Sequence, residues 1–188
     1  MKKLFSVGLV AASLAIAGSA QAQKSGGARP AFGVGDNTIG LGVGVGLPYT
    51  YGGFGGIRNS PAFILNYDHG TFGNVGPGTI GIGGIMSIQN SVYRYGNGRR
   101  ENWTSFALGV RGTYHLTILK EKNNKFDPYG GVTFGFRAES SSVYSGTDVR
   151  PMAGAFVGAK YNFVRNFGAW SELGFDVAVF KIGINFNF

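Results

Sequence analysis

Apolar and polar residues alternate along the chain with a period of two. From Ile39 to Leu47, every odd position is aliphatic and every even position is glycine. A helix would scatter these aliphatic side chains around its axis, whereas a strand places them on one face. The same alternation returns near residues 63–68, 80–89, 106–116, 132–137, 157–163, 172–177 and 182–188, where the segment 172–177 sets Leu173, Phe175 and Val177 on the apolar face. The pattern therefore predicts eight β-strands.

The connections between these segments alternate between long and short. Those near 48–61, 90–102 and 139–150 are long and rich in Gly, Ser, Asn, Tyr and Arg, those near 73–78 and 164–167 are short, the one at 117–126 is intermediate, and the one near 178–179 is tight. Long loops at one end and short turns at the other are typical of outer-membrane barrels, in which both termini are periplasmic.

The second face of each strand distinguishes a membrane barrel from a soluble one. A lipocalin-like barrel turns its apolar face inward, so its other face is rich in Lys and Glu. Here that face is mainly Gly, Thr, Ser and Asn, and only 14% of the 188 residues are charged, whereas soluble domains average about 25%. The 34 glycines suit the crowded lumen of an eight-stranded barrel. We therefore expect an all-β fold, an eight-stranded antiparallel up-and-down transmembrane β-barrel, with a soluble antiparallel sandwich as the alternative.

The N-terminus has the three parts of a signal peptide. Lys2 and Lys3 are followed by an apolar stretch, Leu4 to Ala17, and then by the A-x-A cleavage sequence Ala20-Gln21-Ala22. We expect residues 1–22 to be removed after export, residues 23–37 to form an N-terminal periplasmic segment, and residues 38–188 to form the barrel in the cell outer membrane. A retained anchor is the alternative, but the apolar stretch is shorter than the ~20 residues of a spanning helix. The net charge of +8 does not indicate nucleic-acid binding in an exported chain.

The C-terminal octapeptide carries a further signal. Lys181, Gly183, Phe186 and the terminal Phe188 resemble the assembly signal that the barrel-assembly machinery reads on the last strand of Gram-negative outer-membrane barrels. We expect these four residues to act as such a signal.

Four internal motifs are similar to the small eight-stranded family of outer-membrane β-barrel domain proteins, broadly OmpX-like. They are Ser60-Pro61-Ala62, Leu65-Asn66-Tyr67-Asp68-His69-Gly70, Gly109-Val110-Arg111-Gly112-Thr113-Tyr114-His115 and Glu172-Leu173-Gly174-Phe175. The resemblance covers residues 38–188. It implies the fold and contact with outer-membrane lipid, and it supplies no catalytic residues.

No motif indicates catalysis or a cofactor. The sequence Gly76-Pro77-Gly78-Thr79-Ile80-Gly81 fits G-x-G-x-x-G, but a period-two strand follows it instead of a helix. The chain has two histidines, His69 and His115, which we expect at lumen or membrane edges, and it has no Cys and no G-x-S-x-G elbow. We expect a non-enzymatic protein with no catalytic, cofactor-binding or metal site.

Eight charged residues fall on the polar face of the predicted strands: Asp68, Arg111, Arg137, Glu139, Lys160, Glu172, Asp176 and Lys181. They are four bases and four acids, and because an unpaired buried charge is costly, we expect ion pairs across the lumen, with Arg111, Lys160 and Glu172 near its middle. A plug that rigidifies the barrel is our first reading and a selectivity filter is the second.

The segment 93–103 interleaves arginine with aromatic residues on the expected extracellular side, through Tyr93, Arg94, Tyr95, Arg99, Arg100 and Trp103. Arginine suits phosphate or carboxylate groups, and aromatic rings stack on sugars or lie in the membrane interface. Contact with lipopolysaccharide or a surface glycan is one interpretation and a solvated loop is the other.

The sequence as a whole leaves two candidate functions. The first is a barrel with a narrow or closed lumen and a structural or surface-interaction role. The second is a narrow channel for ions or small amphipathic solutes.

Overall fold

The computed structural model describes residues 31–46, 57–94, 100–117, 124–142 and 146–188. Within these ranges the chain forms nine strands: β1 (Asn37–Val45), β2 (Ile57–Asn59), β3 (Ala62–Val75), β4 (Gly78–Arg94), β5 (Arg100–Leu116), β6 (Phe126–Ser141), β7 (Thr147–Val164), β8 (Phe167–Gly174) and β9 (Phe180–Asn187). No helix in these ranges is long and apolar enough to cross a membrane. The predicted signal peptide, residues 1–22, lies outside the described residues.

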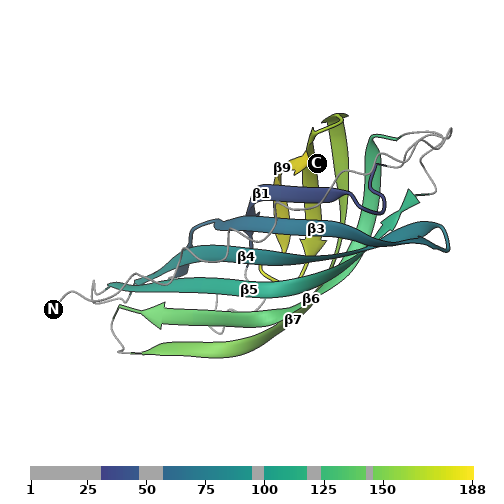
Figure 1. The fold of residues 1–188 in the computed structure, drawn as a ribbon. Helices are drawn as coiled ribbons and strands as arrows, with labels where there is room; N and C mark the ends of the chain where they lie inside the picture. Colours follow the sequence, from purple (N-terminus) through teal and green to yellow (C-terminus); the bar gives the residue numbers. More distant parts are fainter. Residues whose placement is uncertain (1–30, 47–56, 95–99, 118–123, 143–145) are drawn as a thin grey trace.

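The nine strands occupy eight positions in a closed antiparallel barrel (Figure 1). The short β2 and the longer β3 both pair with β4 and are separated by Ser60 and Pro61, so they form one interrupted barrel strand. The pairings β1–β9 and β4–β5 close the ring. The predicted eight-stranded antiparallel barrel is thus confirmed.

The register fixes the shear of the barrel. From Val43, the paired residues lead through β3, β4, β5 and β6 to Val149 of β7. In the opposite direction they lead through β9 and β8 to Ala159 of the same strand, ten residues further on. Strands that close with such an offset are tilted, and an eight-stranded barrel is narrow enough for side chains to fill its interior.

The two ends of the barrel differ. One end, called here the turn end, carries the β3–β4 and β7–β8 turns and both Asn37 and the C-terminal Phe188, whose backbones hydrogen-bond to each other over 3.0 Å in both directions. The other end is called the loop end. At the loop end, β4 to β7 with 16 to 18 residues reach beyond β1, β8 and β9 with 8 or 9 residues (Figure 1).

Two of the loops expected at this end are shorter than predicted. Arg94 pairs with Arg100, and Ser140 pairs with Thr147, so most of the segments 90–102 and 139–150 is strand. Their Gly, Ser and Asn content suggested loops, but polar residues can occupy a ladder wherever its face is wet. The predicted long-loop residues Tyr93, Arg94, Arg100 and Trp103 therefore belong to β4 and β5.

Apolar side chains cover the outer face, as the alternation predicted, and most of the inward residues are polar or small. The inward glycines of β1 make room for Trp170. A methyl group at Gly42 would lie 2.6 Å from Cζ2 of Trp170 and 2.5 Å from the carbonyl oxygen of Ile182. Glycine is thus required at this position by the Trp170 ring and by the backbone of the neighbouring β9.

One strand assignment is wrong. Val177 was expected on the outer face, but β8 ends at Gly174, and the connection that follows brings residues 176–178 into the barrel. Val177 and Ala178 are each 1% exposed. The alternation continued by chance across a bend, where period two no longer determines the face.

Candidate functional site

Six charged side chains form one continuous series of ion pairs across the lumen, in which cations and carboxylates alternate. In order they are Lys160, Asp68, Arg111, Glu172, Lys181 and Asp176, and each is at most 3% exposed. We call them the lumen network. They come from β7, β3, β5, β8, β9 and the β8–β9 connection, so the network ties together strands on all sides of the barrel.

Glu172 lies at the centre of the lumen network. Its Oε1 lies 2.6 Å from Nη2 of Arg111 and accepts a hydrogen bond of 2.8 Å from the hydroxyl of Tyr129. Its Oε2 lies 2.8 Å from Nζ of Lys181. Arg111 continues the series with its Nε 3.3 Å from Oδ1 of Asp68. The Glu172 carboxylate thus forms ion pairs with two cations.

The two ends of the network are also bound. Lys160 Nζ lies 3.1 Å from Oδ2 of Asp68, and Lys181 Nζ lies 2.5 Å from Oδ1 of Asp176. Thr133 donates to the other oxygen of Asp176 over 3.2 Å. Three cations face three carboxylates, so the network is neutral, which lowers the cost of burying it.

Aromatic rings also contact the three cations of the lumen network. The guanidinium carbon of Arg111 lies 4.2 Å from the ring centre of Phe156, and Nζ of Lys181 lies 4.9 Å from the same ring. Nζ of Lys160 lies 5.1 Å from the ring centres of both Phe32 and Tyr129. Such contacts stabilise a cation by about 0.5 to 2 kcal/mol, more when water is excluded.

A stack of rings closes the lumen toward the turn end. Phe32 precedes β1, and its ring centre lies 3.9 Å from the ring centre of His115. The ring centre of His115 lies 4.9 Å from that of Tyr129. His115 is fully buried, with Nδ1 2.8 Å from a carboxylate oxygen of Asp127 and Nε2 3.0 Å from the hydroxyl of Thr113. A cavity of about 530 Å³ at the turn end reaches inward as far as Phe32.

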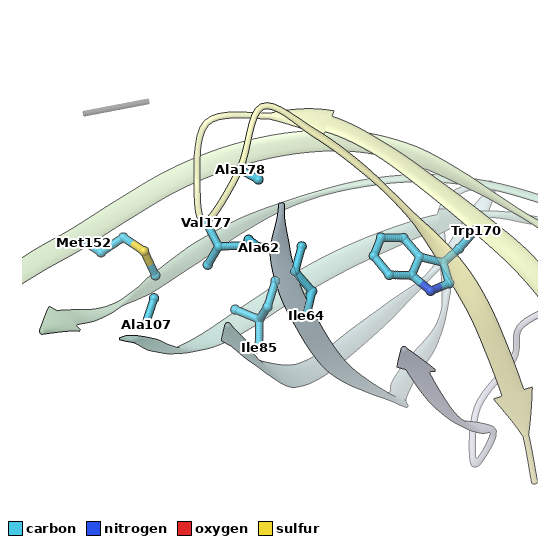
Figure 2. Close-up of a cluster of buried hydrophobic side chains, with 8 residues drawn as sticks. All are labelled: Ala62, Ile64, Ile85, Ala107, Met152, Trp170, Val177 and Ala178. Carbon is cyan, nitrogen blue, oxygen red and sulfur yellow. The ribbon is translucent and has the colours of Figure 1, made fainter. Parts of the chain in front are cut away.

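An apolar cluster closes the lumen toward the loop end (Figure 2). Val177 extends from the β8–β9 connection toward side chains of the opposite strands, and Ala178 lies next to it on the connection. The cluster consists of Ala62, Ile64, Ile85, Ala107, Met152, Trp170, Val177 and Ala178, each at most 4% exposed. The lumen therefore has three layers: an apolar lid, the lumen network and the aromatic stack.

The eight residues that the alternation predicted for the lumen do not all join the network. Arg137 points inward but donates to the backbone oxygen of Asp176 over 3.2 Å. Glu139 is half-buried near the loop end and makes no ion pair with a residue that the structure describes. Lys160 and Glu172, which we grouped together, form no ion pair with each other, and the ion pairs of the network connect them through Asp68 and Arg111.

Sequence reasoning missed three members of the filled lumen: Phe32, Asp127 and Tyr129. Phe32 precedes the first alternating segment, so no pattern placed it inside. Asp127 and Tyr129 lie on β6, which begins at Phe126, several residues before its expected start. Continuing the alternation back from Thr133 would have set Tyr129 and Asp127 on the inner face. His115 was expected at a lumen or membrane edge and is instead fully buried.

The C-terminal residues divide between the two faces of β9. Lys181 belongs to the lumen network, whereas Phe186 and Phe188 are exposed on the outer face. A methyl group at Gly183 would overlap the backbone of Leu41, so this glycine allows the close approach of β9 and β1. The octapeptide is thus the strand that closes the barrel.

The aromatic and arginine residues of segment 93–103 lie in different surroundings. Arg100 is exposed at the start of β5, and Trp103 is half-buried. Tyr93 and Arg94 are placed by their backbone pairing with Glu101 and Arg100, and Tyr95 and Arg99 lie outside the described residues. In the part of the chain that the structure describes, no group of His, Cys, Asp or Glu side chains could hold a metal ion.

Comparison with known proteins gives structural matches only. No protein-family model matches the chain, and no curated protein matches it. The outer membrane protein OprG from Pseudomonas aeruginosa matches with a TM-score of 0.51 and 11% identity, over 85% of this chain and 99% of that chain. Two further matches have lower TM-scores. Ail, the attachment invasion locus protein of Yersinia pestis, crystallised with the heparin analogue sucrose octasulfate, gives 0.48 at 14% identity over 82% of this chain and 99% of that chain. The N-terminal β-barrel domain of Pseudomonas aeruginosa OprF gives 0.44 at 15% identity over 84% and 100%.

At 11% identity, the match to OprG shows only that the two chains share a fold. OprG and this chain align over nearly the whole length of OprG, and both the register and the match support a small closed barrel. The resemblance to small eight-stranded outer-membrane barrels is therefore confirmed at the level of the fold.

Proposed function

We propose that the protein is an integral outer-membrane barrel with a sealed lumen, which performs a structural or surface-interaction role and no catalysis. The outer face supports membrane insertion. Phe63, Val110, Phe134 and Phe136 are each about 60% exposed on that face, among many other large apolar side chains. A soluble protein rarely exposes a continuous apolar surface of this extent, whereas a lipid bilayer covers it.

The three layers of the lumen carry the proposal of a sealed barrel. An ion crossing the barrel would have to displace the apolar lid, separate the ion pairs around Glu172 and move Phe32 from His115. Each of these steps exposes a buried charge or apolar surface. Porins conduct through barrels of about 16 to 18 strands, and eight strands leave a lumen that side chains can fill.

The orientation and maturation follow from the two ends. We propose that the turn end, with both termini, faces the periplasm and that the loop end faces the outside. Residues 1–22 act as a cleaved signal peptide, residues 23–37 form the periplasmic segment, from which Phe32 enters the lumen, and the barrel-assembly machinery reads Lys181, Gly183, Phe186 and Phe188.

Two measurements test the proposal. Membrane fractionation after expression in a Gram-negative host should place the folded protein in the outer membrane, and recovery in the soluble fraction would contradict it. Planar-bilayer recording of the purified barrel should show no steady conductance. Large, ion-selective currents would refute the sealed lumen and favour the alternative, a narrow channel for ions or small amphipathic solutes.

A further inference from the structure

Phe32 occupies a space inside the turn end that fits a single aromatic ring. Its ring stacks on His115, with 3.9 Å between the ring centres and 23° between the ring planes. Nζ of Lys160 lies 5.1 Å from the centre of the Phe32 ring. Gly81 leaves room for the edge of the ring, because a methyl group there would lie 3.4 Å from Cε1 of Phe32. We call the space between His115, Lys160 and Gly81 the ring seat.

Phe32 enters the ring seat from a turn and not from a strand. The turn runs from Gly33 to Asp36, where the backbone N–H of Asp36 donates to the carbonyl oxygen of Gly33 over 3.2 Å. The backbones of Gly35 and Asp36 hydrogen-bond to Gly70 of β3 over 2.8 and 2.9 Å, so the turn is fixed to the barrel. Gly33 joins this turn to Phe32, and glycine has the widest choice of backbone conformations. The ring can therefore leave the ring seat by rotation at Gly33, with β1 unchanged.

The polar groups of the ring seat keep their partners when the ring leaves. His115 remains bonded to Asp127 at 2.8 Å, and Lys160 remains paired with Asp68 at 3.1 Å. Displacing Phe32 therefore leaves no buried polar group without a partner. The cost is the exposure of one apolar ring and of the surface that it covers, and a second aromatic ring in the same place offsets most of it.

A cavity leads from the turn end to the ring seat. It is the cavity of about 530 Å³ described above, and Ala31 and Phe32 belong to its lining. Sites for small molecules have volumes of about 300 to 1,000 Å³, so this cavity has the size of such a site. A small molecule in the cavity thus reaches the ring seat as soon as Phe32 leaves it.

The described residues that line the cavity favour an anion. Lys125 and Arg165 are basic and exposed, against one acid, Asp36. Deeper in the cavity, Nδ2 of Asn162 donates to the carbonyl oxygen of Ala31 over 3.5 Å. A carboxylate can accept this hydrogen bond in place of Ala31, and the two cations attract it into the cavity.

We propose that the ring seat and the turn-end cavity form a binding site for a small arylalkyl carboxylate, with Phe32 as the resident occupant. The ring of the ligand displaces Phe32 and stacks on His115, and its carboxylate replaces the Ala31 carbonyl at Asn162. The chain of bonds from the ring of Phe32 to the carbonyl oxygen of Ala31 is as long as that from the ring to the carboxylate of 4-phenylbutanoate, which is therefore the probe. The apolar lid and the lumen network stay in place, so the bound ligand opens no path across the barrel.

Isothermal titration calorimetry of the mature barrel in detergent micelles, with empty micelles as the baseline, measures the binding of 4-phenylbutanoate. The unmodified barrel should bind it weakly, because only molecules in which Phe32 has left the ring seat are competent. Phe32→Ala removes the resident ring and should bind at least about tenfold more tightly, since a minor conformation is populated to at most about 10%. No binding to the unmodified barrel would overturn the proposal, because the site would then be only an engineered cavity. Equal affinities of the two proteins would also overturn it, because the ligand would not use the ring seat.

Two analogues of the probe define the ligand class. The ligand 4-cyclohexylbutanoate keeps the charge but loses the aromatic ring, and it should bind several-fold more weakly because stacking on His115 and the contact with Lys160 are lost. The ligand 4-phenylbutylamine carries a cation and should not bind. An affinity of either analogue equal to that of 4-phenylbutanoate would overturn the assignment of an aromatic carboxylate.

Substitutions in the cavity test where the carboxylate binds. Asn162→Asp keeps an oxygen that accepts from Asn185 and Asn187, but it replaces the amide donor with a negative charge, so binding should be lost. Arg165→Gln should weaken binding several-fold. The matched control, Arg100→Gln, removes an exposed arginine at the loop end and should leave binding unchanged. Unchanged binding in Asn162→Asp, or equal effects of Arg165→Gln and Arg100→Gln, would overturn the site. The gel shift between heated and unheated samples verifies that each variant is folded.

This inference goes beyond the proposed function and is tested separately from it. Calorimetry uses the purified barrel, so a negative result refutes the arylalkyl carboxylate site and leaves the proposed location and sealed lumen untouched. A protein that does not reach the outer membrane refutes the proposed function whatever it binds in micelles.

Discussion

Replacing Glu172 with glutamine removes the central charge of the lumen network while nearly preserving its volume. In the variant, Lys181 keeps Asp176, but Lys160 and Arg111 must share Asp68. One buried cation is therefore in excess. Breaking a buried pair by removing one partner costs about 3 to 5 kcal/mol, and we expect Glu172→Gln to lower the free energy of unfolding by about this amount.

The order of charges in the network predicts how a second change combines with the first. Adding Lys160→Gln removes the excess cation and leaves two complete pairs, Asp68 with Arg111 and Lys181 with Asp176. The double variant should therefore cost less than the sum of the single variants, by about 1 to 3 kcal/mol, although Lys160 and Glu172 are not in contact. Adding Asp176→Asn instead leaves three cations and one carboxylate, and this double variant should cost more than the sum.

Urea unfolding of the barrel in detergent micelles measures these differences, with the fluorescence of the buried Trp170 as the signal. Arg150→Gln is the matched control, because Arg150 pairs with Asp148 at the exposed loop end, and its effect should add to that of Glu172→Gln. If both double variants were additive within about 0.5 kcal/mol, the six charges would not act as one network. A stable Glu172→Gln variant would refute the reasoning outright.

Three further predictions concern maturation, assembly and packing. The mature protein should begin at Gln23, which intact mass spectrometry of the membrane-extracted protein will show, and a mass equal to that of the full chain would contradict cleavage. Phe188→Ala, or deletion of this residue, should reduce the heat-modifiable folded form in outer membranes, whereas an unchanged yield would mean that the terminal ring carries no assembly signal. Gly42→Val should destabilise the barrel by about 1 to 3 kcal/mol in the urea assay, because its side chain would overlap Trp170. Gly112→Val should be neutral, because a methyl group at Gly112 meets no other atom. Equal effects of the two variants would contradict the packing explanation.

Period-two alternation predicted the strands well where each strand is straight and has one apolar face. The stretch Phe106 to Leu116 shows this most clearly, because every outward residue in it except Gly112 contrasts with a polar or small inward neighbour. Alternation failed at Val177, where the chain bends inward. It also ended β4 too early and began β5 too late, because the hydrogen-bonded ladder from Arg94 to Arg100 continues past the apolar surface with polar residues on both faces.

The alternation predicted which charged residues face the lumen but not which of them form ion pairs with one another. Alternation can show that Asp68, Arg111, Lys160 and Glu172 share the inner face. It cannot show which cation meets which carboxylate, because that depends on the tilt and shear of the barrel. The alternation could not predict that Phe32 lies in the lumen, because this ring enters the lumen from a segment that precedes β1.

The pairing of β1 with β9 determines when the fold can form. Asn37 and Phe188 hydrogen-bond across 151 positions of sequence, so the first strand waits for the last residues to be synthesised. Until then, every N-terminal fragment of the barrel has an open sheet edge and an unsealed interior, and contacts so distant in sequence form slowly. The barrel can therefore close only once the last strand is available, and the proposed route to the outer membrane requires that the chain be protected from aggregation until then.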